Sequence, residues 1–414
     1  MRTVKWNAFL SGICGFAVAL GVVAAAHADV TTEKGASILI FPKVRSTLQF
    51  NTVIQIANTG NSMVHARCFY VDASLFSTLN GAPCTVPGPT CVANWQETDF
   101  DIWLTKQQPT HWVASTGRLS FAGLPGPDLG PLAAGFPPGR IPPVGNAFEG
   151  ELKCVEVTEN DDPLPGNHLK GEATIEAITT AVLPCIPPLN TPDLLCGFAG
   201  STTLGDVSKY NAIGIEGNPN TPPTSNKLPL DGQIYDACPA QLIVNHFAGG
   251  LGASDPVASE LNTPVVVVGS VTNTELTLVP CAENFETQVP TASTIQFLVT
   301  NEFEQKFSAS TTVLCYLSTF LTEIDSPTEQ PPEISQHSVF SRAVLGTTVA
   351  TTTITPVVNT DGTVHAVVGV VERETTVIPA GGVTFATARA AYNIHTRGDL
   401  IPSTGPEEIV LSEP

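Results

Sequence analysis

Short runs rich in Val, Ile, Thr and Phe recur along the chain between turn residues, and this pattern restricts the fold more than any other feature. Runs of about four to eight such residues are typical of β-strands. Long helical periodicity is scarce, and only residues 240–248 and 384–392 are expected to form short helices. We therefore predict an all-β protein. The expected strands are 36–44, 98–105, 150–159, 263–273, 293–301, 347–358 and 362–373.

Two stretches carry hairpin signals. The Asp361-Gly362 pair separates the last two expected strands, and both central positions of a type I′ turn need the positive φ angle that Asp and Gly tolerate. Residues 51–73, NTVIQIANTGNSMVHARCFYVDA, contain two alternating apolar runs around a small polar turn. The sequence predicts a hairpin at each place.

The stretch IQIANTGNSMVHARCFYVDA resembles the strand-turn-strand of bacterial secreted and surface immunoglobulin-like modules of the cell-adhesion-related type. The resemblance covers this short stretch only, and the cysteine within it departs from the pattern of those modules. It implies an immunoglobulin-like β-sandwich. It carries no catalytic or binding residue over to this chain, because a sandwich fold does not decide function.

Length and turn content favour two sandwich domains. The 414 residues exceed what one small core usually takes, and the chain contains 34 Gly and 35 Pro. We predict an N-terminal sandwich over 29–255 and a C-terminal sandwich over 256–414, joined between Phe247 and Pro264. Long surface loops are expected where prolines cluster, since proline lacks the N–H that a ladder interior needs. These loops are 122–146, 184–197 and 216–230.

The N-terminus has the layout of a cleaved secretory leader. Arg2 and Lys5 precede an uncharged apolar stretch that ends at Ala26, and small residues flank a cut before Asp29. A retained membrane anchor is the alternative, since the apolar stretch approaches the length of a membrane span. We predict a signal peptide at 1–28 and a mature protein without an integral membrane span, located in the periplasm, at the cell surface or outside the cell.

The acidic balance excludes one class of partner. The chain has 18 basic and 38 acidic residues, a formal net charge of −20, and loss of Arg2 and Lys5 with the leader makes it more acidic still. Nucleic-acid binding requires Lys and Arg to neutralise phosphates, so nucleic acid is not an expected partner. Other surface proteins or a neutral glycan remain, and much of the acidity serves solubility.

Cysteine usage agrees with export to an oxidising compartment. Of the ten cysteines, Cys14 lies in the leader, which leaves an odd number in the mature chain. Connectivity does not follow from spacing, but proximity along the chain and in expected strands suggests four pairs, with Cys238 left as a free thiol or an intermolecular link. The candidate pairs are Cys68–Cys154, Cys84–Cys91, Cys185–Cys196 and Cys281–Cys315.

Tryptophans gather in the segment from Trp95 to Trp112. If 98–105 is a strand, Asp99, Asp101 and Trp103 share one face, and apolar residues share the other. A tryptophan between carboxylates on an exposed face can stack on a sugar ring, so Asp99, Asp101, Trp103 and Trp112 are candidate ligand-binding residues. The alternative is that the tryptophans fill the core.

Motifs for catalysis and cofactors are scarce in the sequence. It contains no G-x-S-x-G elbow, H-E-x-x-H helix or P-loop. No cofactor is expected, although the pairs Asp99 and Asp101, or Asp161 and Asp162, offer carboxylates for calcium. Neither run matches an EF-hand loop. In the segment GNHLKGE, His168 lies near Glu172, which is a candidate acid/base pair.

Three function classes remain. The preferred one is a secreted non-catalytic β-sandwich protein of the cell surface or extracellular matrix, acting in adhesion or assembly. The second is a carbohydrate-binding protein that uses the Trp95–Trp112 region. The third is a secreted hydrolase whose acid and base come from distant loops.

Overall fold

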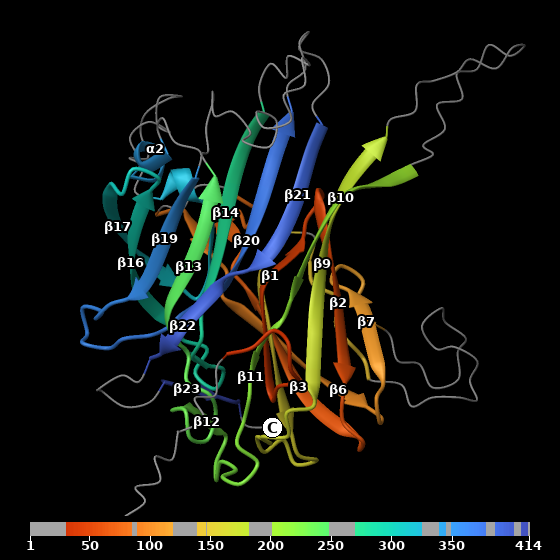
Figure 1. Ribbon diagram of the computed structural model, residues 1–414. Coiled ribbons are helices and arrows are strands. Elements are labelled where there is room, and N and C mark those ends of the chain that lie inside the picture. The colour runs from red at the N-terminus through yellow and green to blue at the C-terminus, as the bar shows by residue number, and fades with distance from the viewer. Residues whose placement is uncertain are drawn as a thin grey trace, which may run out of the picture.

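The computed structural model is all-β, as the sequence predicts (Figure 1). Among the described residues, helix is confined to α2 (Val339–Val344) and one 3-10 turn, η1 (Leu321–Glu323), and no described helix is long and apolar enough to cross a membrane. The predicted leader, the Cys185–Cys196 pair and most of the predicted linker lie outside the described residues. These are 30–84, 89–118, 139–145, 147–181, 201–247, 270–324, 339–344, 349–377, 386–400 and 407–412.

A nine-stranded antiparallel sheet from the N-terminal half folds back on itself at the corner between β1 and β2. These two strands share a single residue pair, Ser46 with Asn51. Beyond the corner, β2 pairs with β7 and β9, whereas β1 pairs with β8 and β11. The order is β10-β9-β2-β1-β8-β3-β6, with β7 on β2 and β11 on β1. The strands are β1 (Ile38–Ser46), β2 (Phe50–Asn58), β3 (Val64–Asp72), β6 (Gln96–Leu104), β7 (Pro109–Val113), β8 (Phe148–Val157), β9 (Leu169–Ala181), β10 (Ser201–Asn211) and β11 (Ile213–Ile215).

The hairpin predicted over 51–73 is wrong, although both of its strands exist. β3 pairs with β6 and β8, and β2 pairs with neither of these strands. Ile54 and Ile56 of β2 instead join the same buried cluster as Cys68 and Tyr70 of β3. The small polar turn therefore carries the chain across the core from one layer to the other, because each run buries its apolar side against the opposite layer.

Strands β1, β3 and β8 are buried on both faces. Phe41 of β1 packs in the core inside the folded sheet, whereas its neighbour Ile40 packs in a second cluster on the outer face. The second cluster also contains Phe69 and Val155, together with Val368 from the C-terminal half. A strand covered on both sides reads as a continuous apolar run, which explains the ILIF segment at the start of β1.

The C-terminal half contains a five-stranded and a four-stranded sheet. Their orders are β17-β16-β19-β13-β22 and β18-β14-β20-β21, and a third buried cluster is drawn from both sheets. Figure 1 places these green-to-blue strands beside the red-to-yellow N-terminal sheet. The strands are β13 (Pro239–Phe247), β14 (Ser270–Pro280), β16 (Ala292–Asn301), β17 (Lys306–Leu314), β18 (Leu317–Phe320), β19 (Val349–Pro356), β20 (Val367–Val377), β21 (Ala386–Asn393) and β22 (His395–Asp399).

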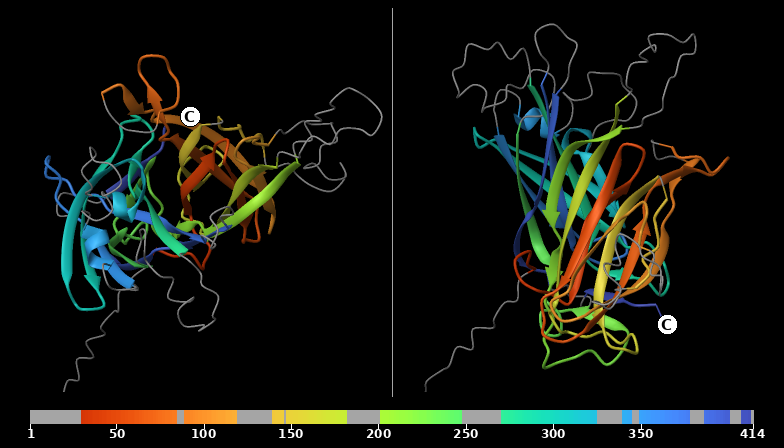
Figure 2. Two further views of the ribbon diagram at one scale, coloured as in Figure 1. Left: turned by 90° about the horizontal axis from the view of Figure 1, so that it is seen from above. Right: turned by 90° about the vertical axis from the view of Figure 1, so that its right-hand side faces the viewer.

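Two small sheets complete the fold. One has the order β12-β23-β15 and joins β12 (Lys227–Leu230) to β15 (Glu283–Asn284) and β23 (Glu407–Val410), so it combines segments from both halves of the chain. The other pairs β4 (Leu75–Ser77) with β5 (Cys91–Ala93). Figure 2 shows the N-terminal and C-terminal strands side by side in both views.

Three of the predicted local structures in the C-terminal half are wrong, namely two helices and the hairpin at Asp361-Gly362. Both expected helices are strands, β13 and β21, since each hydrogen-bonds along a neighbouring strand. The Asp361-Gly362 pair does form a turn, with Gly362 at a φ of 88°. However, β19 and β20 on either side of it belong to different sheets, because the chain crosses from one layer to the other after the turn.

The strand pairing also bears on the domain division. The predicted boundary at residue 255 assigns β13 to the N-terminal domain, yet β13 pairs with β19 and β22 of the C-terminal sheet. The two halves share the cluster that contains Phe69 and Val368. The observed architecture is that of packed β-sheets in sandwich-like layers, and two separate immunoglobulin-like domains stay a prediction.

Buried ion pairs join the two halves. The Lys43 ammonium on β1, which is fully buried, lies 2.8 Å from a carboxylate oxygen of Glu275 on β14 and 2.7 Å from one of Glu372 on β20. Arg45 bridges Glu275 to Glu149 of β8. Burial by itself favours the neutral acid, but Lys43 and Arg45 hold the pKa of Glu275 well below its usual range.

Three disulfides are present among the described residues. Cys68–Cys154 and Cys84–Cys91 are the pairs predicted from the sequence. The predicted Cys281–Cys315 pair is wrong, and so is the prediction that Cys238 is left unpaired: Cys281 bonds to Cys238, and Cys315 is a free, buried thiol among the described residues. Disulfide connectivity within the C-terminal half depends on which strands the fold brings together. The expected strands did not include β13, which begins directly after Cys238.

Candidate functional site

The outer face of β3 and β6 presents the aromatic and charged residues singled out in the sequence. Within β6, Phe100, Ile102 and Leu104 are buried in the core. Asp99 and Asp101 are exposed on the opposite face and Trp103 is half-buried there. The alternation predicted for this strand is therefore confirmed, because successive residues of a strand point to opposite faces.

Trp103 is fixed by a residue from the neighbouring strand. His65 of β3 lies directly across the ladder from Trp103. The two rings stack with their centroids 3.8 Å apart and their planes 6° apart. One face of the indole is thus covered by the imidazole, and the partly exposed side chain has little freedom to rotate.

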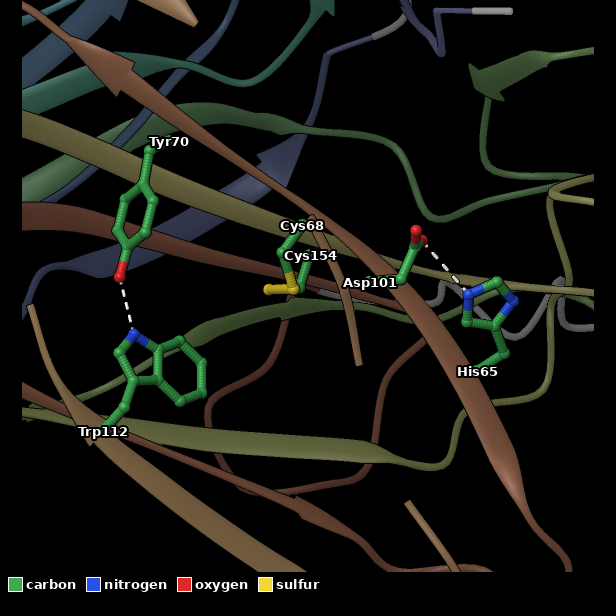
Figure 3. Close-up of a disulfide and its surroundings, with 6 residues drawn as sticks. All are labelled: His65, Cys68, Tyr70, Asp101, Trp112 and Cys154. Carbon is green, nitrogen blue, oxygen red and sulfur yellow. Dashed lines mark hydrogen bonds and ion pairs between the residues drawn. A yellow bond between two sulfur atoms is a disulfide. The ribbon is translucent and has the colours of Figure 1, made fainter. Parts of the chain in front are cut away.

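His65 bonds through both ring nitrogens. Its Nε2 lies 3.1 Å from Oδ1 of Asp101 (Figure 3), and its Nδ1 lies 2.8 Å from the carbonyl oxygen of Thr158. Asp161, in the loop after β8, places Oδ1 3.7 Å from the same Nδ1. Burial by itself disfavours the imidazolium, but these two hydrogen bonds and the two carboxylates outweigh it and raise the pKa of His65.

Asp99 has a separate partner. A terminal guanidinium nitrogen of Arg67 donates to Oδ2 of Asp99 at 2.8 Å, and the other terminal nitrogen donates to the carbonyl oxygen of Ser412 at 2.8 Å. Because Arg67 and His65 lie on the same face of β3, the outer surface carries two cation–carboxylate pairs next to Trp103. The candidate site is named here the Trp103 face and consists of His65, Arg67, Asp99, Asp101 and Trp103.

Trp112 is not part of this face, which corrects its inclusion among the candidate ligand residues. It is only 2% exposed. Its Nε1 donates to the hydroxyl of Tyr70 at 2.6 Å inside the sandwich (Figure 3). Trp112 is on β7, which pairs with β2 rather than with β6, and its side chain points into the core.

Trp95 occupies a third environment. It has a positive φ of 49° and lines a small cavity with Glu97, Glu283 and Cys315. Burial and the nearby carboxylate of Glu283 raise the pKa of Glu97 to about 7, and burial raises the pKa of the Cys315 thiol. The thiol is thus held in its protonated, poorly nucleophilic form. The tryptophans that are close in the sequence are therefore divided among a cavity, a surface and the core.

The carboxylate pairs suggested for calcium do not act as pairs. Asp99 contacts Arg67, whereas Asp101 contacts His65, so neighbouring carboxylates of β6 turn to different partners. The side chain of Asp161 approaches His65. Asp162 instead makes a backbone contact, in which its carbonyl oxygen accepts the Thr158 amide N–H at 2.8 Å. The structure instead brings together Asp101 and Asp161, which are far apart in the sequence.

The suggested pair of His168 and Glu172 is also divided. His168 Nδ1 lies 2.7 Å from Oε1 of buried Glu156. Glu172 pairs with Lys209 at 2.6 Å on the adjacent strand. Glu172 and Lys209 are on the paired strands β9 and β10, whereas His168 precedes β9 and contacts a residue of β8. The structure therefore does not assemble the acid/base pair that the segment suggested.

Sequence reasoning missed His65 and Arg67, and it named Asp161 only with Asp162 as a carboxylate pair for calcium. The alternation of VHARCFYVD puts His65 and Arg67 on one face, but nothing in the sequence pairs this strand with β6. Comparison of the chain with protein-family models found no match, and comparison with curated proteins found none either. The geometry of the Trp103 face therefore carries the functional argument.

Proposed function

We propose that this is a secreted, non-catalytic β-sandwich protein of the cell surface or extracellular matrix that acts in adhesion by binding a neutral glycan. The observation that carries the proposal is the rigid, partly exposed indole of Trp103 on the same face of β6 as the carboxylates of Asp99 and Asp101. A fixed aromatic face stacks on the apolar side of a sugar ring, while carboxylates accept hydrogen bonds from its hydroxyls.

The charge of the protein supports an uncharged ligand. The formal net charge of −20 repels anionic polymers at low ionic strength. The two basic groups on the Trp103 face, His65 and Arg67, are each engaged with a carboxylate. A neutral polysaccharide meets no such repulsion. Disulfides and the leader-like N-terminus support the extracellular setting.

An immunoglobulin-like arrangement of the layers is part of this proposal. The resemblance of residues 54–73 to bacterial surface modules and the sandwich-like packing support it. The outer face of β6, where Asp99 and Asp101 are exposed, is the surface that meets another surface molecule in this proposal.

A secreted hydrolase is the second candidate function, and the cavity beside Trp95 is the observation that favours it. Glu97 and Glu283 both line this cavity, and the raised pKa of Glu97 leaves it able to donate a proton near neutral pH. Glu283, however, forms an ion pair with the fully buried Lys153. A hydrolytic role therefore requires Glu97 to act with a group other than Glu283.

Affinity electrophoresis of the mature protein in gels containing neutral polysaccharides tests the adhesion proposal. Retardation by at least one neutral polymer is expected, and Trp103→Ala is expected to reduce it several-fold. Phe303→Ala is the matched control, because Phe303 is an exposed aromatic residue, 65% accessible, next to β16 of the C-terminal sheet. Equal retardation of the wild type and Trp103→Ala by every polymer that retards the protein would count against the proposal.

A further inference from the structure

We propose that His65, Asp101 and Asp161 form a binding site for a divalent transition-metal ion of the zinc class. One ligand atom from each of the three side chains lies within 4.8 Å of the other two. The inference rests on this convergence, and it does not depend on the proposed glycan binding.

The fold gathers the three ligands from separate segments. His65 is on β3, Asp101 is on β6, and Asp161 is in the turn between β8 and β9. In the ladders, His65 is the direct partner of Trp103 on one side and of Val157 on the other. Because β8 ends beside His65, the turn formed by residues 158–162 lies against the imidazole ring.

The orientation of the His65 ring suits metal binding. Thr158 offers a carbonyl oxygen 2.8 Å from Nδ1, so a proton on Nδ1 is held there, and an ion that binds to Nε2 takes the place of the hydrogen bond between Nε2 and Asp101. Metal-binding histidines commonly donate the other ring N–H to a carbonyl in this way. Stacking on Trp103 further fixes the ring. When the ion binds to Nε2, any proton on that nitrogen leaves to solvent.

The spacing between Nε2 and Asp101 fits two ligands of one ion. Bonds of about 2.0 Å to a tetrahedral ion place adjacent ligand atoms roughly 3.3 Å apart. The observed separation from Nε2 to Oδ1 of Asp101 is 3.1 Å. A mixed imidazole and carboxylate set favours zinc, copper or nickel over calcium, which prefers oxygen ligands alone.

Asp161 supplies the second, independent observation. Its Oδ1 is buried and has no hydrogen-bond donor, and the 3.7 Å contact with His65 Nδ1 is longer than a hydrogen bond. A buried carboxylate oxygen without a donor costs free energy, which a nearby cation offsets.

Asp99 provides a control in the same surface. It lies two residues from Asp101 on the same face of β6, but Arg67 neutralises it at 2.8 Å. A loss of general negative charge affects Asp99→Asn and Asp101→Asn alike. Loss of a metal ligand affects Asp101→Asn only.

Isothermal titration of the metal-stripped, mature protein with zinc chloride alone tests the site, with calcium chloride as the comparison. One saturable zinc site is expected, and Asp101→Asn and Asp161→Asn are each expected to weaken it by roughly tenfold or more. His65→Gln is expected to abolish it, and Asp99→Asn is expected to bind as the wild type does. Melting curves confirm that each variant is folded.

Absence of saturable zinc heat in the wild type would overturn the inference. So would equal weakening by Asp99→Asn and Asp101→Asn, or binding of calcium as tight as that of zinc. If His65→Gln does not fold, the two Asp variants still decide, since Asp101 is exposed and Asp161 is in a turn. The zinc titration contains no glycan, so its failure leaves the adhesion proposal standing, and failure of the glycan experiment leaves the metal site standing.

Discussion

The indole of Trp103 and the imidazole of His65 stack almost in parallel, with ring centroids 3.8 Å apart, on the outer face of adjacent strands. Because this contact is at the surface, we expect Trp103→Ala to lower the free energy of unfolding by only about 1 kcal/mol, the value of an aromatic pair beyond its buried area. Urea unfolding followed by circular dichroism measures the change. A loss as large as that of a core tryptophan would show that Trp103 is a packing residue.

Trp112 gives the opposite expectation. Its side chain is 2% exposed, and it donates a hydrogen bond to Tyr70 within the core. Trp112→Ala removes a large buried ring and leaves the Tyr70 hydroxyl without this donor, so a loss of about 3 to 5 kcal/mol is expected. The same urea titration, run on both tryptophan variants, compares the two directly. Similar losses for the two would contradict the assignment of surface and core.

The two tryptophans also show how far the sequence determines the site. Strict alternation in β6 is a local property, so it predicts correctly that Asp99, Asp101 and Trp103 share a face. Which strand lies beside β6 is a long-range property, and β3 lies more than twenty residues earlier in the chain. For this reason His65 and Arg67 entered the site only with the structure.

The same distinction explains the errors in the fold. β21 contains four alanines, which favour helix, yet a continuous ladder with β20 makes it a strand. The polar turns after β2 and at Asp361-Gly362 are real, but a turn residue does not reveal whether the chain returns in the same sheet or crosses to the other layer. Tertiary packing decides that, because each strand buries its apolar face.

The buried ion pairs between the halves predict a large effect from one lysine. Lys43→Met leaves Glu275 and Glu372 without their shared cation, and breaking a buried pair in this way costs roughly 3 to 5 kcal/mol. Lys227→Met is the matched control, since Lys227 forms a surface pair with Glu408 and solvent-exposed pairs of this kind contribute little to stability. Chemical denaturation of both variants gives the comparison. An equally small effect at Lys43 would mean that Arg45 and Arg389 alone neutralise the two carboxylates.

The disulfide assignment predicts the outcome of peptide mapping. Under non-reducing conditions, a Cys238–Cys281 peptide is expected, and Cys315 is expected to react with a thiol reagent only after unfolding, because it is buried. Cys238→Ser should destabilise the protein by roughly 2 to 5 kcal/mol. Cys315→Ser should leave all three described disulfides intact. Recovery of a Cys281–Cys315 peptide would contradict the assignment.

A buried aspartate predicts how stability changes with pH. Asp236 is 4% exposed, its Oδ2 has no hydrogen-bond partner, and burial together with the nearby Glu216 raises its pKa to about 7. The folded protein therefore holds this proton more tightly than the unfolded chain, where the pKa is about 3.9. The resulting stability is fully present below the unfolded pKa and is lost as pH rises towards 7.

Asp236→Asn removes this titration, so the wild type should lose stability relative to the variant between pH 5 and pH 8, by roughly 1 to 2 kcal/mol. Urea unfolding of both proteins at the two pH values gives this difference. Asp361→Asn is the control: hydrogen bonds from Thr363 lower the pKa of the exposed Asp361, which is ionised at both pH values, so its difference from the wild type should stay constant. If Asp236→Asn also differed from the wild type by a constant amount, Asp236 would not titrate in the folded protein between pH 5 and pH 8, and a raised pKa of about 7 would be contradicted.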